Sequence, residues 1–83
     1  MKITVRLFAN LKELAGRDAL EMEMNEGANV EALVALISAE LPQLEEILGK
    51  KAVFISVNQE MAKNKDILSE GDEVGLLPPF SGG

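Results

Sequence analysis

The residues best suited to chemistry stand at the end of the chain, in the segment Pro78-Pro79-Phe80-Ser81-Gly82-Gly83. Glycine has no Cβ, so extended glycines fit a narrow channel and leave the last carbonyl carbon open to attack. A terminal carboxylate is ionised at neutral pH and becomes an acyl donor only after activation, for example as an acyl-adenylate. We therefore expect the Gly83 carboxylate to be the reacting group and residues 78–82 to thread it into a partner.

The two prolines favour this interpretation over a chance ending. Two terminal glycines arise by chance in about 0.5% of chains of average composition, and chain ends are often frayed. Proline cannot donate a ladder hydrogen bond, however, so the chain must leave its sheet at Pro78. A polyproline conformation at Pro78 and Pro79 would lower the entropy lost when the tip docks. Six extended residues reach roughly 20 Å.

Other candidate groups have simpler explanations. Glu21 and Glu23 could act as an acid–base or metal-binding pair. They alternate strictly with Leu20, Met22 and Met24, however, which predicts a strand with the two glutamates on its solvated face and the apolar residues on its buried face. The methionines are then core residues.

The basic segment Gly49-Lys50-Lys51 resembles a phosphate loop only superficially. Position 44 is leucine where that motif needs glycine, and Lys51 replaces its Ser or Thr. Glu70, Asp72 and Glu73 are typical of turns. The chain has no cysteine or histidine, so we expect no disulfide, no metal site and no cofactor bound by this chain.

Composition predicts one small globular domain. The 83 residues are 47% hydrophobic but only 4% aromatic, so the core must be aliphatic. The formal charge of -6 disfavours nucleic acid and anionic membrane surfaces and favours a basic protein partner. Lys2, Thr4 and Arg6 interrupt any secretory signal, and we expect a cytoplasmic protein.

Hydrophobic periodicity predicts the elements that position the tail. Alternation predicts strands near residues 2–7 and 20–24, a β-rich run at 53–57, a short strand at Met61 and a last strand at 74–77. Asn29 should cap a helix that Pro42 ends, and Asn10 should cap a short turn ended by Gly16. The expected fold is α+β: a β-grasp with a mixed sheet of about five strands and one main helix across it. We expect residues 1–77 to form the domain and 78–83 a flexible tail.

Four apolar residues are out of phase with this core or lie beyond it. Phe8 and Leu77 follow core residues on the first and last strands, which run side by side and parallel in a β-grasp sheet. With Met61 and Phe80 they predict a partner-docking patch where the tail leaves. Scattered surface apolar residues, or a secondary core, are the alternative.

The sequence also resembles a known family over essentially its whole length. The ending Gly71-Asp72-Glu73-Val74 with residues 77–83, and the opening Lys2 to Phe8 with the turn at 11–16, resemble the small subunit of molybdopterin synthase, a ubiquitin-like sulfur carrier. Pro-Pro-x-x-Gly-Gly in this setting is fairly specific. Leu76-Leu77 stands where family members often have aromatic residues.

The resemblance implies a complete chemistry for Gly83. A ubiquitin-activating-type adenylyltransferase uses ATP to adenylate the terminal glycine, and a sulfurtransferase system converts it to a thiocarboxylate. The tail then enters the large synthase subunit, which holds the catalytic side chains, in a complex of two small and two large subunits. There it donates sulfur to cyclic pyranopterin monophosphate to form the molybdopterin dithiolene.

Three other functions stay open. A sulfur carrier for cysteine or thiamine synthesis would share the fold, although the length and the Pro-Pro tail argue against thiamine. A ubiquitin-like protein modifier would form isopeptide bonds through the same glycine. A pure interaction module would have an inert tail.

Overall fold

The computed structural model describes residues 1–50 and 53–78. The strands are β1 (Lys2–Leu7), β2 (Ala19–Glu23), β3 (Phe54–Val57), β4 (Glu60–Met61) and β5 (Glu73–Leu77). The helices are α1 (Ala9–Ala15), α2 (Val30–Glu40) and α3 (Glu45–Gly49), with a 3-10 turn, η1 (Pro42–Leu44), between the last two. Every strand predicted from periodicity is therefore present.

The strands form a mixed sheet in the order β2-β1-β5-β3-β4. The central pair, β1 and β5, is parallel, with Val5 beside Val74 and Leu7 beside Leu76. The other pairings are antiparallel. A mixed sheet with first and last strands parallel at its centre, crossed by α2, is the predicted α+β β-grasp arrangement.

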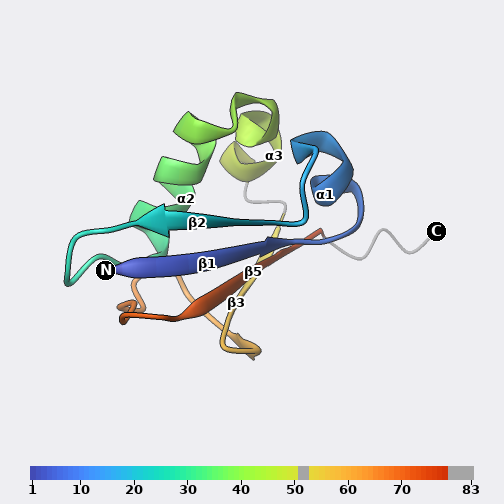
Figure 1. Cartoon of the computed structure of the whole chain (residues 1–83). Helices are drawn as coiled ribbons and strands as arrows, with labels where there is room; N and C mark the ends of the chain where they lie inside the picture. Colours follow the sequence, from blue (N-terminus) through green and yellow to red (C-terminus); the bar gives the residue numbers. More distant parts are fainter. Residues whose placement is uncertain (51–52, 79–83) are drawn as a thin grey trace.

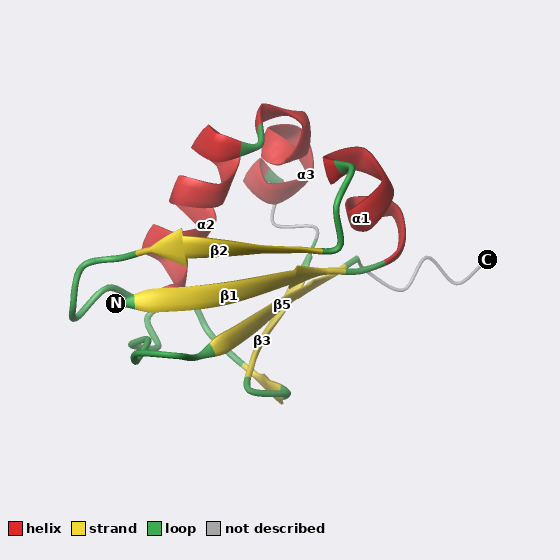
Figure 2. Cartoon of the chain, viewed as in Figure 1, coloured by secondary structure: helices red, strands yellow, loops and turns green. Residues whose placement is uncertain are grey.

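The helices lie together on one side of the sheet, and the opposite side carries no helix in the described residues (Figures 1 and 2). Between the two layers is an aliphatic core that excludes water almost completely. Its buried members are Ile3, Val5, Leu7, Leu11, Met22, Val30, Leu33, Ile37, Leu44, Leu48, Leu68, Val74 and Leu76. Met22 belongs to this core and Met24 packs against it, as the alternation predicts.

Helix α2 begins and ends as the sequence predicts. The Asn29 side chain accepts a hydrogen bond from the backbone N–H of Ala32 at 2.9 Å. Leu41 is the C-cap, and Pro42 starts the next turn. Because Pro42 disfavours helical geometry at the preceding residue, the helix stops there.

The prediction that Asn10 caps the first helical turn is wrong. Helix α1 begins at Ala9, two residues before the start that an Asn10 cap predicts, with Phe8 as its N-cap and no capping bond from a side chain. Ala9 has a left-handed φ of 52°, so the chain already turns into the helix before Asn10. Gly16 ends the helix in the left-handed conformation, as predicted, with φ of 75°.

None of the helices in residues 1–50 and 53–78 combines the length and the apolar character that a membrane crossing requires.

Candidate functional site

The tail begins at the end of a central strand. Strand β5 ends at Leu77, and Pro78 is the last residue described. Since β5 runs parallel to β1, its end lies beside Leu7 and the following Phe8. The predicted reacting residue Gly83 and the predicted threading residues Pro79, Phe80, Ser81 and Gly82 lie outside the described residues, so their roles stay predictions.

Sheet register decides which side chains face away from the core. Phe54 pairs with Leu77, and Ser56 pairs with both Gly75 and Met61. Side chains of directly opposed residues lie on the same face of a sheet. Phe54, Ser56, Met61 and Leu77 therefore share the outer face, opposite to the face that packs against the helices.

An apolar hollow forms on this face where the tail begins. It has a volume of about 320 Å³ and is lined by Phe54, Met61, Leu77 and Pro78. Phe54 is 49% exposed and Met61 67% exposed. The structure thus brings together Met61 and Leu77, two of the predicted docking residues, at the base of the tail.

Sequence reasoning missed Phe54. The signal was available, because Val53, Ile55 and Val57 alternate with it and pack against the core. A phenylalanine out of phase with such a run must lie on the opposite face of the strand.

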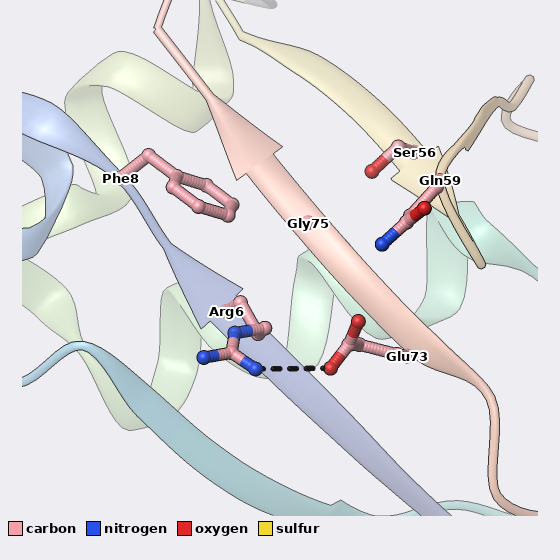
Figure 3. A pocket seen from close by; sticks show the side chains of 6 residues that line it. All are labelled: Arg6, Phe8, Ser56, Gln59, Glu73 and Gly75. Atoms are coloured by element: carbon pink, nitrogen blue, oxygen red, sulfur yellow. Dashed lines mark hydrogen bonds and ion pairs between the residues drawn. The ribbon is translucent and has the colours of Figure 1, made fainter.

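A second, polar hollow lies on the same face (Figure 3). It has a volume of about 280 Å³, and its lining residues come from β1, β3, β5 and the loops that follow β1 and β3. They are Arg6, Phe8, Ser56, Gln59, Glu73 and Gly75. Arg6 Nη1 donates to Glu73 Oε2 at 3.2 Å across the strands, so two of its charged groups already neutralise each other.

The turn after β3 places Gln59 at this hollow. Asn58 and Gln59 have φ of 52° and 70°, the left-handed pair that a tight hairpin turn needs. Asn58 Oδ1 accepts from the backbone N–H of Glu73 at 3.0 Å, and its Nδ2 donates to Asp72 Oδ1 at 3.0 Å. The Asn58 side chain thereby ties the turn to the start of β5.

Phe8 lies against the middle of β5. Its Cε2 would be 3.3 Å from a Cβ placed on Gly75, and Figure 3 shows the ring pointing towards that residue. Phe8 is still 42% exposed. The same Cβ on Gly75 would be 3.9 Å from Leu77 Cδ1, so Phe8 and Leu77 flank Gly75. We call Phe8, Phe54, Met61, Leu77 and Pro78 the docking face.

The acidic candidates lie where the sequence predicts them, on a solvated strand face and around a turn. Glu21 and Glu23 are exposed on β2, where Lys2 Nζ lies 4.0 Å from Glu21 Oε1. Glu70 Oε1 accepts from the backbone N–H of Lys2 at 3.0 Å, and Asp72 Oδ2 accepts from that of Ser69 at 2.8 Å. The Glu70 and Asp72 carboxylates thus bind backbone N–H groups at the start of β1 and in the turn before β5.

The basic segment also has a structural explanation. Lys50 Nζ donates to Glu46 Oε1 at 3.0 Å, one turn earlier, while Lys51 lies outside the described residues. In the part of the chain that the structure describes, no three acidic, His or Cys side chains gather as metal ligands would.

Comparison with protein families gives a match to the ThiS family over residues 5–83. The chain belongs to the ThiS family. A family relative from Chlamydomonas reinhardtii, a molybdopterin synthase sulfur carrier subunit, is 41% identical, and the alignment covers 100% of both chains. The resemblance to the small subunit of molybdopterin synthase is thereby confirmed.

Solved structures give the same fold. The small archaeal modifier protein 1 of Haloferax volcanii is 26% identical over 95% of this chain and 98% of its own, with a TM-score of 0.87. In the complex of subunits 1 and 2 of the molybdopterin-converting factor from Helicobacter pylori, a chain is 27% identical over 100% of both chains, with a TM-score of 0.73. The ubiquitin of Caldiarchaeum subterraneum has a TM-score of 0.66 at 20% identity and shares the fold. The β-grasp prediction, including its ubiquitin-like character, is confirmed.

Proposed function

We propose that this chain is the sulfur-carrier subunit of a molybdopterin synthase. The observation that carries the proposal is the full-length similarity to a subunit of that name, at 41% identity. The fold is compatible with it, because β5 leads directly to the tail beside an exposed apolar surface.

The reacting group in this proposal is the Gly83 carboxylate. An adenylyltransferase of the ubiquitin-activating type joins a carboxylate oxygen to the α-phosphorus of ATP, and pyrophosphate leaves. A sulfurtransferase system then supplies sulfur to the acyl carbon and AMP leaves, so that the chain ends in a thiocarboxylate. That sulfur replaces an oxygen of cyclic pyranopterin monophosphate and Gly83 is left as a carboxylate, so the two sulfurs of the molybdopterin dithiolene need two loaded chains. ATP is bound by the activating partner, and this chain needs no cofactor of its own.

The large synthase subunit is the proposed receptor of the tail. Phe8, Met61 and Leu77 would contact it, with Phe80 following from the tail. The Helicobacter pylori complex of subunits 1 and 2 supports a two-subunit assembly. The charge of -6 favours a basic surface on the partner, and we place the reaction in the cytoplasm.

A sulfur-transfer assay tests the function. Thiocarboxylated chain, large subunit and cyclic pyranopterin monophosphate are mixed, and molybdopterin is measured. We expect product in proportion to the thiocarboxylate supplied and none from a chain lacking Gly83. Full activity of the chain without Gly83 would contradict the proposal.

A ubiquitin-like protein modifier is the second candidate function. The similarity of this chain to the small archaeal modifier protein 1 supports it. Such a modifier would form isopeptide bonds from Gly83 to lysine side chains. Lysine-linked adducts in a cell extract supplied with ATP would support it, whereas a thiocarboxylate without adducts supports the sulfur carrier. The neighbouring genes would distinguish a sulfur carrier for molybdopterin synthesis from a sulfur carrier for cysteine synthesis.

A further inference from the structure

The methionines are the side chains of this protein that a mild oxidant attacks. The chain contains no cysteine, histidine, tryptophan or tyrosine, so hydrogen peroxide finds its targets among four methionines. The reaction turns a flexible apolar thioether into a polar sulfoxide, and methionine sulfoxide reductases reverse it. Which methionine reacts first therefore depends on which sulfur the solvent reaches.

The four methionines differ strongly in exposure. Met61, on β4, is 67% exposed, whereas Met22 is 6% exposed within the core. Met1 and Met24 are partly buried and pack against the same core. Peroxide in solution therefore reaches Met61 most easily.

Met61 also lies where a sulfoxide would affect binding. It lines the apolar hollow at the start of the tail, together with Phe54, Leu77 and Pro78. The side chains of these three neighbours have no polar atom, so none of them can donate a hydrogen bond to a sulfoxide oxygen. In the free chain, water solvates that oxygen. A partner that covers the hollow would remove this water without a replacement from these side chains, and a buried polar atom without a hydrogen bond disfavours binding.

We propose that Met61 is an oxidation site whose sulfoxide weakens partner docking. A lone pair of the Met61 sulfur attacks one oxygen of hydrogen peroxide, and the O–O bond breaks. The transferred oxygen gives its proton to the leaving hydroxide, which becomes water, so the sulfur loses two electrons and the peroxide gains them. A methionine sulfoxide reductase restores the thioether: two thiols become a disulfide, and the sulfoxide oxygen leaves as water. This inference rests on the proposed function, because the docking concerned is that of the large synthase subunit.

A peroxide titration tests which methionine reacts. The full chain, with its C-terminal carboxylate unmodified, is treated with increasing hydrogen peroxide, and mass spectrometry of its proteolytic fragments gives the oxidation rate of each methionine. We expect Met61 to be oxidised about tenfold faster than Met22, in line with their exposed fractions, and faster than Met1 and Met24. Oxidation of any of the other three before Met61 would overturn the inference.

Calorimetric titration with the large synthase subunit, after the peroxide has been removed, tests the consequence. Oxidation of Met61 should weaken binding about tenfold or more, and treatment with a methionine sulfoxide reductase and a thiol should restore the starting affinity. The matched control is Met61→Leu, which has a similar volume and no sulfur. Its affinity should be the same before and after peroxide. Undiminished affinity of the Met61 sulfoxide, or an equal loss in treated Met61→Leu, would contradict the proposal.

Prior binding gives an independent readout. When the large subunit is present in excess, oxidation of Met61 should slow several-fold, while oxidation of Met1 and Met24 keeps its rate. An unchanged rate at Met61 would place this side chain outside the contact and rule out the proposed effect.

The proposed function fails in a different way. If the unoxidised, thiocarboxylated chain gives no molybdopterin with the large subunit, the function is wrong whichever methionine is oxidised. If it gives molybdopterin while the Met61 sulfoxide binds normally, only the role of Met61 oxidation is wrong.

Discussion

Phe8 and Met61 are large apolar side chains held at the surface of a small acidic protein. Residues of this kind carry a large share of binding energy when a partner covers them. The phase of Phe8 and Leu77 relative to the core residues predicted that these two side chains face away from the core. The outward placement of Phe54 could also be predicted from its phase, but only the register shows that Phe54 lies opposite Leu77.

Alanine substitution measures the contribution of the docking face. We expect Phe8→Ala and Met61→Ala each to weaken binding to the large synthase subunit by about 1–2 kcal/mol, or roughly 5- to 30-fold. Leu14→Ala is the matched control, because Leu14 is 46% exposed on α1 and lies outside the docking face. Calorimetric titration gives the affinities. Equal losses for Leu14 and Phe8 would argue against a specific docking face.

The elements position the site through their order. β1 and β5 are adjacent and parallel, so Phe8, which follows β1, and Pro78, which follows β5, lie at the same end of the sheet. Periodicity predicted these strands because each has one buried face. It gave the wrong start for α1, since a left-handed Ala9 has no signal in an amphipathic pattern.

Substitutions of Asn29 and Asn10 test directly where helices α2 and α1 begin. Asn29→Ala removes the bond to the Ala32 N–H and should lower the free energy of unfolding by about 1 kcal/mol. Asn10→Ala should leave stability unchanged or raise it slightly, because Asn10 lies inside α1 and makes no cap. Urea unfolding of both variants gives the comparison. A larger loss for Asn10 would mean that α1 starts where the sequence alone suggests.

At the scale of the whole molecule, the strand that leads to Pro78 lies at the centre of the sheet and packs against an aliphatic core. Helices cover one face of the sheet, and the other face leaves Phe8, Phe54 and Met61 exposed near the strand that leads to Pro78. The fold class could be predicted from the order and spacing of the elements, because few topologies bury the apolar faces of all these strands and helices. The two hollows could not be predicted, because their shapes depend on side-chain contacts between strands distant in the sequence.

The central claim is that this chain carries the reacting group while other chains carry the catalytic residues. The described residues supply a scaffold, and we assign partner binding to the docking face and the reaction to Gly83, with catalysts on other proteins. An added C-terminal residue should therefore abolish function while leaving the fold and the docking face unchanged.

Intact-mass analysis tests this claim most directly. The chain is incubated with the adenylyltransferase, ATP and a sulfur donor, beside a chain lacking Gly83. We predict that one oxygen of the full chain is replaced by one sulfur, and that fragmentation of the chain locates this sulfur at Gly83. The shortened chain should keep its mass. An unchanged mass of the full chain, with an activating enzyme shown to be active on a related carrier, would contradict the account.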